Sequence, residues 1–354
     1  MNVKKLFGII KVTFHTFVTM NLLRKILLPV VPVYYFITWL RNKMYDLGIK
    51  KSTGYDFPVI AVGNLSVGGT GKSPMIEYLI RLLREEVKLA TLSRGYKRET
   101  EGFQLVKSSS TVKEVGDEPL QFKTKFPEVF VSVDSDRRRG IANLIKFNPK
   151  PDTILLDDAY QHRKVKAGFY ILLTAYYDLY CDDILLPTGN LREPREGAKR
   201  ADIIVVTKCP EDISVDERKR IRKKLNIEDH QSLFFATINY GNEVIGSSEM
   251  RSLEVFKNSS FSLITGIANP KRLVEYYDSL GLQFNHINFP DHHNFSEKEL
   301  EEFRNLEHII TTEKDYMRLS GNFKSDNLWY QPIEMKFVEN GEEFNKMIFS
   351  YIKK

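Results

Sequence analysis

Cysteine is scarce in this 354-residue chain, which has only Cys181 and Cys209. The two residues lie far apart and match neither a disulfide framework nor the spacing of a metal-binding pair. We therefore expect a protein of a reducing compartment that has no disulfide framework. Its hydrophobic content of 42% and charged content of 28% are ordinary for a globular protein, and its length is sufficient for two domains.

A long hydrophobic run is also missing. The apolar stretch at residues 26–40 reads ILLPVVPVYYFITWL and contains Pro29 and Pro32. It is shorter than the ~20 apolar residues that a membrane-spanning helix requires. No small-residue cleavage site follows it, so a secretory signal peptide is not expected either.

The excess of positive charge is confined to the N-terminal segment. Of the net charge of +6, residues 1–51 carry +8, from nine Lys or Arg against Asp46 alone, so the remainder is slightly acidic. This distribution argues against a nucleic-acid-binding surface. The cations flank an apolar stretch that contains Tyr34, Tyr35 and Trp39, and this combination predicts a helix lying on an anionic membrane surface.

Two alternatives for this segment stay open. The helix could pack on its own domain, or residues 22–40 could span the membrane. The sequence from Met20 onward also makes sense as a complete start, in which case residues 1–19 would be an upstream extension.

Residues 58–73 read PVIAVGNLSVGGTGKS, an apolar strand followed by a glycine-rich turn. Such a turn can surround a polyphosphate with backbone N–H groups, while Lys72 reaches the β- and γ-phosphates and the Ser73 hydroxyl binds Mg²⁺. Apolar residues at helical spacing after Pro74 predict a helix whose N-terminus faces the anion. The sequence therefore predicts a nucleoside triphosphate site. Its loop residues are Ser66, Val67, Gly68, Gly69, Thr70, Gly71, Lys72 and Ser73.

Strand and helix patterns alternate after this loop, which predicts an α/β fold with a doubly wound, mostly parallel sheet of the P-loop NTPase kind. Strands are expected at 59–62, 89–92, 154–157, 170–173 and 203–207, and helices at 74–86, 116–124 and 216–225. After a connector at 240–260 the alternation restarts, with strands at 262–265 and 309–310, a helix at 271–280 and a capping box at 296–299.

We therefore predict three parts of the chain. Residues 1–50 form a membrane-associated N-terminal segment, residues 51–240 form the P-loop domain, and residues 241–354 form a smaller C-terminal α/β domain.

Several charged residues follow the expected strands. Asp157 and Asp158 could hold Mg²⁺ directly or through water, although a capped turn is the alternative. Asp117 lies in Gly-Asp-Glu-Pro and could orient a hydroxyl nucleophile, yet Asp-Glu-Pro is also an ordinary helix start. Arg137 could bind phosphate or an anionic substrate, with a charged helix start as the alternative, and Arg192 lies in a second arginine-containing loop.

Two further motifs have ambiguous roles. His292 and His293 follow Asp291 and could be zinc ligands, or an Asp-His unit could act with a distant carboxylate. Thr207-Lys208-Cys209-Pro210 lies where a GTPase would carry the guanine-reading Asn-Lys-x-Asp, but Asn and Asp are both replaced. A P-loop GTPase or metallochaperone is therefore disfavoured, and a non-catalytic nucleotide-gated membrane adaptor stays open as a second alternative.

Taken together, these motifs resemble the tetraacyldisaccharide 4′-kinase family, the lipid A 4′-kinases of Gram-negative bacteria. The matching residues are Gly63–Pro74, Ser93–Tyr96, Gly116–Pro119, Asp136-Arg137, Leu156–Asp158, Gln161–Arg163, Leu186-Pro187, Gly189, Leu191–Pro194, Thr207–Cys209, Gly266–Pro270, Asp291-His292 and Thr312–Asp315. The family is similar in having Ser or Thr at the position of Ser66. The chain departs from it in Ala159-Tyr160, where Gly-Leu is expected, and in a longer N-terminus.

The resemblance implies transfer of the γ-phosphate of ATP to the 4′-hydroxyl of a tetraacylated glucosamine disaccharide 1-phosphate, which gives the 1,4′-bisphosphorylated lipid A precursor. The enzyme would lie on the cytoplasmic face of the bacterial inner membrane, as a peripheral or monotopic protein. Its C-terminal domain would close over the nucleotide.

The family roles carry over by motif position. Lys72 and Ser73 would bind phosphates and Mg²⁺, and Asp157 and Asp158 would organise the metal. The remaining roles fall to Asp117, which would activate the 4′-hydroxyl, to His292 as its partner, and to Arg137 and Arg192 as phosphate or substrate contacts.

Overall fold

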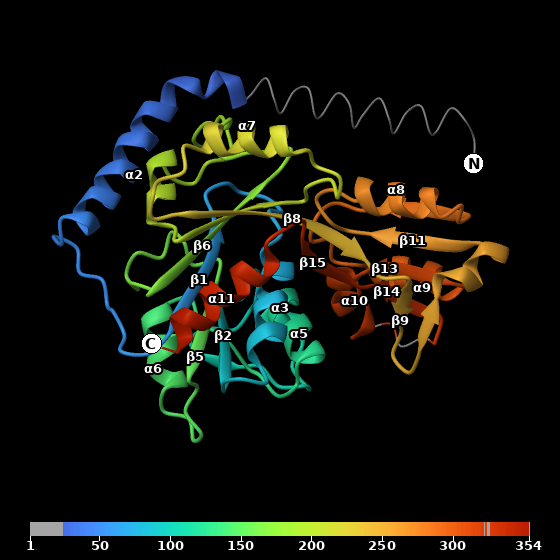
Figure 1. The fold of residues 1–354 in the computed structure, drawn as a ribbon. Helices are drawn as coiled ribbons and strands as arrows, with labels where there is room; N and C mark the ends of the chain where they lie inside the picture. The colour runs from blue at the N-terminus through green and yellow to red at the C-terminus, as the bar shows by residue number, and fades with distance from the viewer. Residues whose placement is uncertain (1–23, 322, 324–325, 354) are drawn as a thin grey trace.

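The computed structural model describes residues 24–321, 323 and 326–353. Met20 and the rest of residues 1–23 lie outside the described part of the chain. The described residues form two sheets, a large one and a small one, with helices on both faces of each (Figure 1).

The large sheet confirms the expected doubly wound, mostly parallel architecture. Its strand order is β15-β8-β7-β6-β1-β5-β2-β4-β3, and only the edge pairs β15-β8 and β3-β4 are antiparallel. The strands are β1 (Val59–Asn64), β2 (Leu89–Ser93), β3 (Gln104–Leu105), β4 (Phe130–Val133), β5 (Thr153–Asp157), β6 (Phe169–Ala175), β7 (Ile203–Thr207), β8 (Ser232–Tyr240) and β15 (Ile333–Phe337).

Alternation along the buried strands divides the apolar core between two faces. Ile60 and Val62 of β1 point to the face covered by helices α3, α5 and α11, whereas Val59 and Ala61 point to the face that carries α6. Helix α7 also packs against the sheet, on Leu172, Ile204 and other residues of β6 and β7. These helices are α3 (Lys72–Leu83), α5 (Asp117–Lys125), α6 (Arg137–Leu144), α7 (Val215–Leu225) and α11 (Gly341–Ile352).

The small sheet has the order β10-β9-β14-β13-β11-β12, and its four strands from β14 to β12 are parallel. Its strands are β9 (Glu243–Ile245), β10 (Met250–Ser252), β11 (Phe261–Thr265), β12 (Phe284–Asn288), β13 (Ile309–Thr312) and β14 (Leu328–Gln331). The helices are α8 (Lys271–Ser279) on one face and α9 (Glu297–Arg304) and α10 (Glu313–Ser320) on the other. We call β9 to β14 with these helices the small-sheet unit.

The structure differs from the expected connector at 240–260. This segment contains β9, β10 and the 3₁₀ helix η3 (Leu253–Asn258), because β9 pairs with β14 and draws the segment into the small sheet. The chain also returns to the large sheet after β14. There β15 pairs with β8, and Phe344 and Ile348 of α11 enter the large-sheet core.

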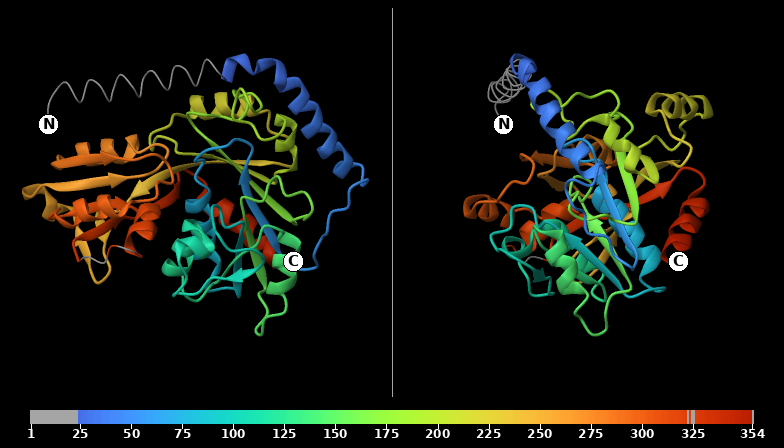
Figure 2. Two further views of the ribbon diagram at one scale, coloured as in Figure 1. Left: turned by 180° about the vertical axis from the view of Figure 1, so that it is seen from behind. Right: turned by 90° about the vertical axis from the view of Figure 1, so that its left-hand side faces the viewer.

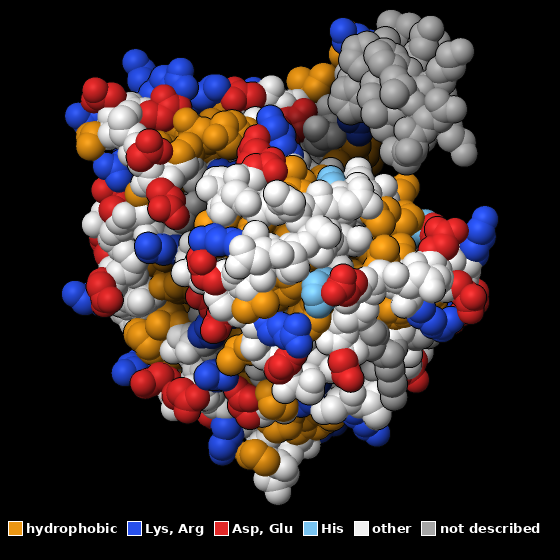
Figure 3. Space-filling model, turned by 90° about the vertical axis from the view of Figure 1, so that its right-hand side faces the viewer, with side chains coloured by type: hydrophobic (Ala, Val, Ile, Leu, Met, Phe, Trp, Pro, Cys, Tyr) orange, Lys and Arg blue, Asp and Glu red, His pale blue; other side chains and the backbone are white. Residues whose placement is uncertain are grey.

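Two neighbouring segments of the chain therefore connect the two parts, and they run in opposite directions. The chain leaves the large sheet after β8 and re-enters it at β15, and Gly241 N donates to Pro332 O at 3.2 Å where the two crossings meet. Figure 2 shows the small-sheet unit projecting from this point. The face at the small-sheet end carries Lys, Arg, Asp and Glu side chains intermingled (Figure 3).

The N-terminal stretch forms a short 3₁₀ helix, η1 (Leu28–Val30), followed by α2 (Val31–Asp46). In Figures 1 and 2, α2 lies along the large-sheet part, at the end of the molecule away from the small sheet. Val31 and Tyr34 pack on the protein, whereas the apolar side chains of Val33, Phe36 and Ile37 are more than half exposed. Within the described residues, no helix combines the length and the apolar character needed to cross a membrane.

Candidate active site

The glycine-rich loop joins β1 to α3 at the carboxyl edge of the large sheet. Gly68 and Gly71 have φ values of 112° and 87°, a backbone conformation that residues other than glycine rarely adopt. The loop is held from two sides, since Val67 N donates to Asn190 O at 2.8 Å and Thr207 Oγ1 donates to Thr70 O at 2.7 Å. Gly71 is the N-cap of α3, so Lys72 and Ser73 begin the helix at the end that favours anions.

Asp157 ends β5 beside this loop. It is 3% exposed, and its Oδ2 accepts a hydrogen bond of 3.2 Å from Ser93, whereas its buried Oδ1 has no hydrogen-bond partner. Burial, and after it the negative charges of Glu118 and Asp158, raise the pKa of Asp157 to about 7. A cation beside the free oxygen would relieve this repulsion, so the donor set suits Mg²⁺.

Glu118 completes the acidic side of the site. Its Oε1 accepts hydrogen bonds of 2.5 Å from Ser73 Oγ and 2.5 Å from Lys314 Nζ. Burial alone would raise the pKa of Glu118, but the positive charge of Lys314 outweighs burial and lowers it. A single carboxylate thus links the phosphate loop to α10 of the small-sheet unit.

Asp158, the next residue after β5, is held by cations. Arg192 Nη1 and Nη2 donate to its two carboxylate oxygens at 3.0 and 2.9 Å, and Lys72 Nζ lies 3.7 Å from Oδ1. Burial would raise the pKa of Asp158, but Lys72 and the hydrogen bond from Arg192 lower it to about 2. Arg192 also donates to the backbone oxygen of Asn64 at the end of β1 at 2.9 Å. The predicted residues Lys72, Asp158 and Arg192 are therefore in one contact network.

Asp117 and His292 are 175 positions apart in sequence and meet in the structure. His292 Nδ1 lies 3.2 Å from Asp117 Oδ2 and 2.9 Å from Arg318 Nη2, and Arg318 Nη2 also bonds Asp117 Oδ2. A protonated Nδ1 would donate to Asp117, whereas an unprotonated Nδ1 would accept from Arg318. Arg318 is itself anchored on Asp315 Oδ1 at 2.8 Å.

The charge around Asp117 is strongly positive. Burial would raise its pKa, but the hydrogen bond from His292 and the charges of Lys314 and Arg318 prevail and hold the pKa well below the ordinary value. His292 has a left-handed backbone with φ of 58°. Such strain in a residue other than glycine persists where the surroundings impose it, often at functional sites.

Arg137 lies in a different environment from Arg192. It is 2% exposed and donates to the backbone oxygens of Asp134 and Asp157 at 2.6 and 2.9 Å. Burial lowers its pKa to about 10, against the attraction of Asp157 and Asp158. The guanidinium positions the end of β5 in this structure, and its predicted contact with phosphate or substrate stays a prediction.

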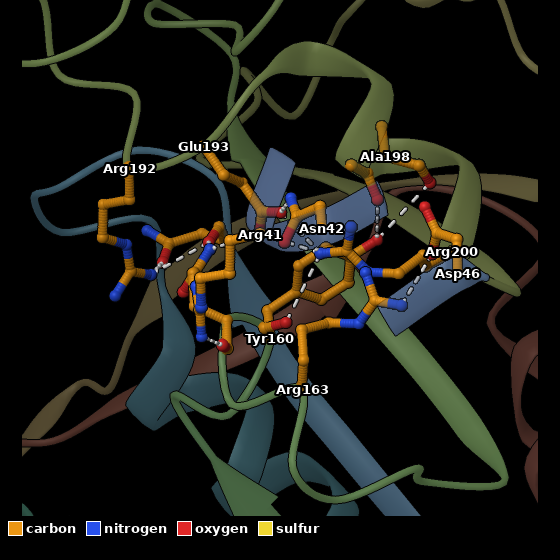
Figure 4. A network of polar contacts seen from close by, with 12 residues as sticks. Arg41, Asn42, Asp46, Tyr160, Arg163, Arg192, Glu193, Ala198 and Arg200 are labelled. Atoms are coloured by element: carbon orange, nitrogen blue, oxygen red, sulfur yellow. Dashed lines mark hydrogen bonds and ion pairs between the residues drawn. The ribbon is translucent and has the colours of Figure 1, made fainter. Parts of the chain in front are cut away.

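A buried ionic network connects the site to α2 (Figure 4). Glu193 accepts hydrogen bonds from Asn42 at 2.7 Å, from Gln161 at 3.0 Å and from Arg200 at 2.8 and 2.9 Å. The neighbouring backbone oxygen of Arg192 accepts from Tyr34 Oη at 3.0 Å. The N-terminal helix thus holds the loop that presents Arg192 to Asp158.

Among the described residues, His292 and His293 have no further side chains beside them that would complete a zinc site. Across the described ranges, no three His, Cys, Asp or Glu side chains form a group that could hold a metal ion. His293 faces Glu299 at 3.1 Å, in the capping box of α9. A P-loop Mg²⁺ site needs fewer protein ligands, because phosphate oxygens and water complete the octahedron.

Sequence reasoning missed the roles of Lys314, Arg318 and Glu193. Lys314 and Arg318 are four residues apart on α10, a spacing that places both on one helix face, and this could have been noticed. Nothing in the sequence indicated that this face meets Asp117 and Glu118.

The comparisons with known proteins cover nearly the whole chain. The model of the tetraacyldisaccharide-1-P 4′-kinase family matches residues 23–353. A tetraacyldisaccharide 4′-kinase of Flavobacterium johnsoniae is 53% identical over 337 residues, which are 94% of this chain and 98% of that protein. The enzyme of the same name from Bacteroides thetaiotaomicron is 41% identical over 94% of both chains. A crystal structure of LpxK from Aquifex aeolicus in complex with ATP is similar, with a TM-score of 0.76 and 31% identity over 93% of this chain and 99% of that one.

Proposed function

The chain belongs to the tetraacyldisaccharide-1-P 4′-kinase family, and we propose how its residues carry out ATP-dependent phosphorylation of the 4′-hydroxyl in lipid A biosynthesis. The contact between Asp117 and His292 carries the proposal. It joins a carboxylate of α5 to a histidine of the small-sheet unit, beside a phosphate loop. A site of this composition suits transfer of a phosphoryl group to a hydroxyl.

The phosphate end of the site neutralises negative charge. The N–H groups of the loop and of the first turn of α3 cradle the phosphates, and Lys72 and Arg192 face the region where the γ-phosphate transfers. Ser73, Asp157 and Asp158, with Glu118 beside them, would hold Mg²⁺, which supplies charge neutralisation between the phosphates.

The acceptor end orients the sugar hydroxyl. In the transfer step a bond forms between the 4′-oxygen and the γ-phosphorus, and the bond from that phosphorus to the β–γ bridging oxygen breaks. The hydroxyl proton passes to the Asp117 carboxylate. His292 either stabilises the protonated carboxyl group or receives the proton from it. Since the pKa of Asp117 is low, the carboxylate is a weak base, which suits a loose transition state in which the nucleophile needs orientation more than early deprotonation.

The membrane-facing part is α2. Its outer face exposes Val33, Phe36, Ile37 and Leu40, which recur at helical spacing. Lys25 and Lys43 are exposed near this face and could meet anionic headgroups. We infer that this face rests on the cytoplasmic surface of the bacterial inner membrane as a peripheral contact, where the acylated substrate is found.

The decisive measurement is ADP release by the purified full-length protein. We expect release from ATP and Mg²⁺ to require an acylated glucosamine disaccharide 1-phosphate presented in mixed micelles, with phosphate appearing at the 4′-position. Release that proceeds equally without the disaccharide would contradict a lipid kinase, and nucleotide binding without any turnover would favour the adaptor alternative.

A further inference from the structure

Lys208 lies at the carboxyl end of β7, directly after Thr207, whose hydroxyl bonds the phosphate loop at Thr70. Its backbone is left-handed, with φ of 57°. Six described residues other than glycine have this conformation. They include Lys208 and two residues of the candidate active site, Asp158 and His292. Since strained backbone gathers at functional sites, Lys208 is a candidate for a role there.

The side chain of Lys208 points at the phosphate loop. A Cβ placed on Gly69 would have Lys208 Nζ at 3.7 Å as its nearest neighbour, so the amine lies directly against a glycine of the anion cradle. Within the part of the chain that the structure describes, this amine has neither a hydrogen-bond acceptor nor an ion-pair partner. Burial lowers its pKa, and the nearby charges of Arg272, Lys314 and Lys72 lower it further against a single opposing acid, Asp178.

This isolation distinguishes Lys208 from the other lysines of the site. Lys72 is paired with Asp158 at 3.7 Å, and Lys314 with Glu118 at 2.5 Å. A half-buried amine without an acceptor costs free energy, and a phosphate ligand would supply the missing acceptor.

Arg272 approaches the same place from the small-sheet unit. It is the second residue of α8, and its guanidinium lies 5.7 Å from the ring centroid of Tyr177 and donates a long bond of 3.5 Å to Cys209 O. No carboxylate of the described chain forms an ion pair with it. Two cations without anionic partners among the described residues, one from each part of the molecule, therefore lie near each other at the carboxyl end of β7, where Lys208 also borders the phosphate loop.

The position of these two cations in the sheet determines which part of the nucleotide they can reach. In the large sheet β7 and β5 lie on opposite sides of β1, so Lys208 approaches the loop from the side opposite to Asp157 and Asp158. The proposed function places the reacting γ-phosphate beside Asp117, Asp157 and Asp158, on the β5 side of β1. The remainder of the nucleotide consequently runs toward β6 and β7.

We propose that Lys208 and Arg272 form a second cationic clamp that binds the nucleoside diphosphate part of the substrate, Lys208 at the phosphates beside Gly69 and Arg272 from the small-sheet unit. This inference rests on the proposed function of the loop as an ATP site. Because the clamp does not touch the γ-phosphate, it serves ATP and ADP alike, and it draws α8 toward β7 only when a nucleotide neutralises the two charges.

Direct binding to the full-length protein tests the clamp. In Lys208→Met, which keeps the length and loses the charge, the Kd of both ATP and ADP measured by calorimetry should rise about 10-fold or more, as for a lost charge-assisted hydrogen bond. Lys208→Arg should retain most of the affinity, and Arg272→Gln should weaken both nucleotides about 3-fold or more. The KM for ATP should rise by more than the kcat falls.

Lys219→Met is the matched control, because this α7 lysine has a side chain that is 74% exposed. If Lys208→Met fails to fold, Lys208→Gln and Arg272→Gln carry the test. Unchanged Kd values for ATP and ADP in folded Lys208 variants would overturn the clamp. If Lys72→Ala still abolished turnover, that result would leave the proposed kinase site in place. If Lys72→Ala were fully active, the proposed kinase site would be rejected as well.

Discussion

The carboxylate of Asp117 has three neighbours that carry or can carry positive charge. Arg318 and His292 compete for one carboxylate oxygen, and Lys314 adds a further charge. The competition matters because Arg318 can hold His292 Nδ1 only when that atom has no proton. A proton that arrives on Asp117 weakens its bond to Arg318 and leaves His292 free to turn its Nδ1 to the carboxyl group. We therefore propose that the three residues act as one unit that orients and relays a proton.

Residues that act as one unit give losses that do not multiply. We expect Asp117→Ala and His292→Ala each to lower kcat by roughly 100-fold or more, and the double variant to be little worse than the poorer single variant. Steady-state turnover with acylated disaccharide measures this. ATP binding should survive in all three proteins, and losses that multiply would show that the two residues act independently.

Charge at the transferred phosphoryl group gives a second residue-level prediction. Lys72→Ala and Asp157→Ala should each leave a folded protein whose kinase activity is reduced by ~100-fold or more, because each removes a group that stabilises or organises the developing charge. Thermal unfolding establishes that the variants are folded, and ADP release measures their activity. Near-normal turnover by Lys72→Ala would refute the assignment of residues 66–73 as a phosphate loop.

At the scale of elements, the two faces of α2 have different surroundings. Tyr34 and Asn42 hold the Arg192-Glu193 loop, whereas Phe36 and Ile37 are 57% and 59% exposed. Deleting residues 1–45 would remove both faces at once. Such a deletion should release the protein from membranes, raise the KM for lipid and also lower the kcat, because Arg192 loses the helix that supports its loop.

Point substitutions separate the loop contact of α2 from its proposed membrane contact. Phe36→Glu combined with Ile37→Glu should abolish binding to vesicles that contain anionic lipid, since it places charge in the apolar face. Asn42→Ala should leave vesicle binding intact and lower the turnover of substrate in detergent micelles by about 3- to 10-fold, through the loss of one hydrogen bond to the buried Glu193. Vesicle sedimentation and a micelle assay give the two readouts. Retention of the charged double variant on vesicles would place the anchor elsewhere.

Local patterns predicted the elements whose residues interact with near neighbours in sequence. The strand, glycine turn and amphipathic helix at β1-α3 were predicted within a few residues, and the capping box of Ser296 and Glu299 is present at the start of α9. By contrast β9 and β10 have three residues each, and they belong to the small sheet because β9 pairs with β14 and β10 pairs with β9. No local pattern encodes such a pairing.

The same limit applies to the site. The spacing of Gly71, Lys72 and Ser73 reflects local backbone geometry, so it could be predicted from the chain. That Arg318 would reach Asp117, and that Asn42 would reach Glu193, depends on how the small-sheet unit and α2 lie against the large sheet. The proximity of Asp117 and His292 was expected only from the family resemblance.

At the scale of the whole molecule, a buried polar cluster joins the two parts of the chain. Lys125 of α5 bonds Glu77 of α3 at 2.6 Å and Glu313 of α10 at 2.7 Å, and Gln121 donates to the same two carboxylates. The carboxylates of Glu77 and Glu313 thus share one lysine. This joint positions α5 against α10, and with α5 it positions Asp117 and Glu118. Burial, and then the charge of Glu77, raise the pKa of Glu313 to about 7.

This raised pKa makes the stability of the joint depend on pH. The unfolded chain releases the Glu313 proton near the ordinary value of 4.5, whereas the folded protein keeps it up to about pH 7. Between these values the folded state binds more protons, so the contribution of Glu313 to stability is fully present below pH 4.5 and is lost as the pH rises to 7.

Glu313→Gln removes the titrating group, and it lacks the ion pair that an ionised Glu313 makes with Lys125 at high pH. The informative quantity is therefore the change of the unfolding free energy with pH. Relative to the unsubstituted protein, the variant should gain about 1–3 kcal/mol in its free energy of unfolding between pH 5 and pH 8. Thermal unfolding at matched ionic strength measures the difference. Glu254→Gln, whose glutamate side chain is 71% exposed, is the control and should show no such trend. Parallel pH curves for Glu313→Gln and the unsubstituted protein would mean that Glu313 is already ionised in the folded state at pH 5, stabilised by the charge of Lys125 and the hydrogen bond from Gln121.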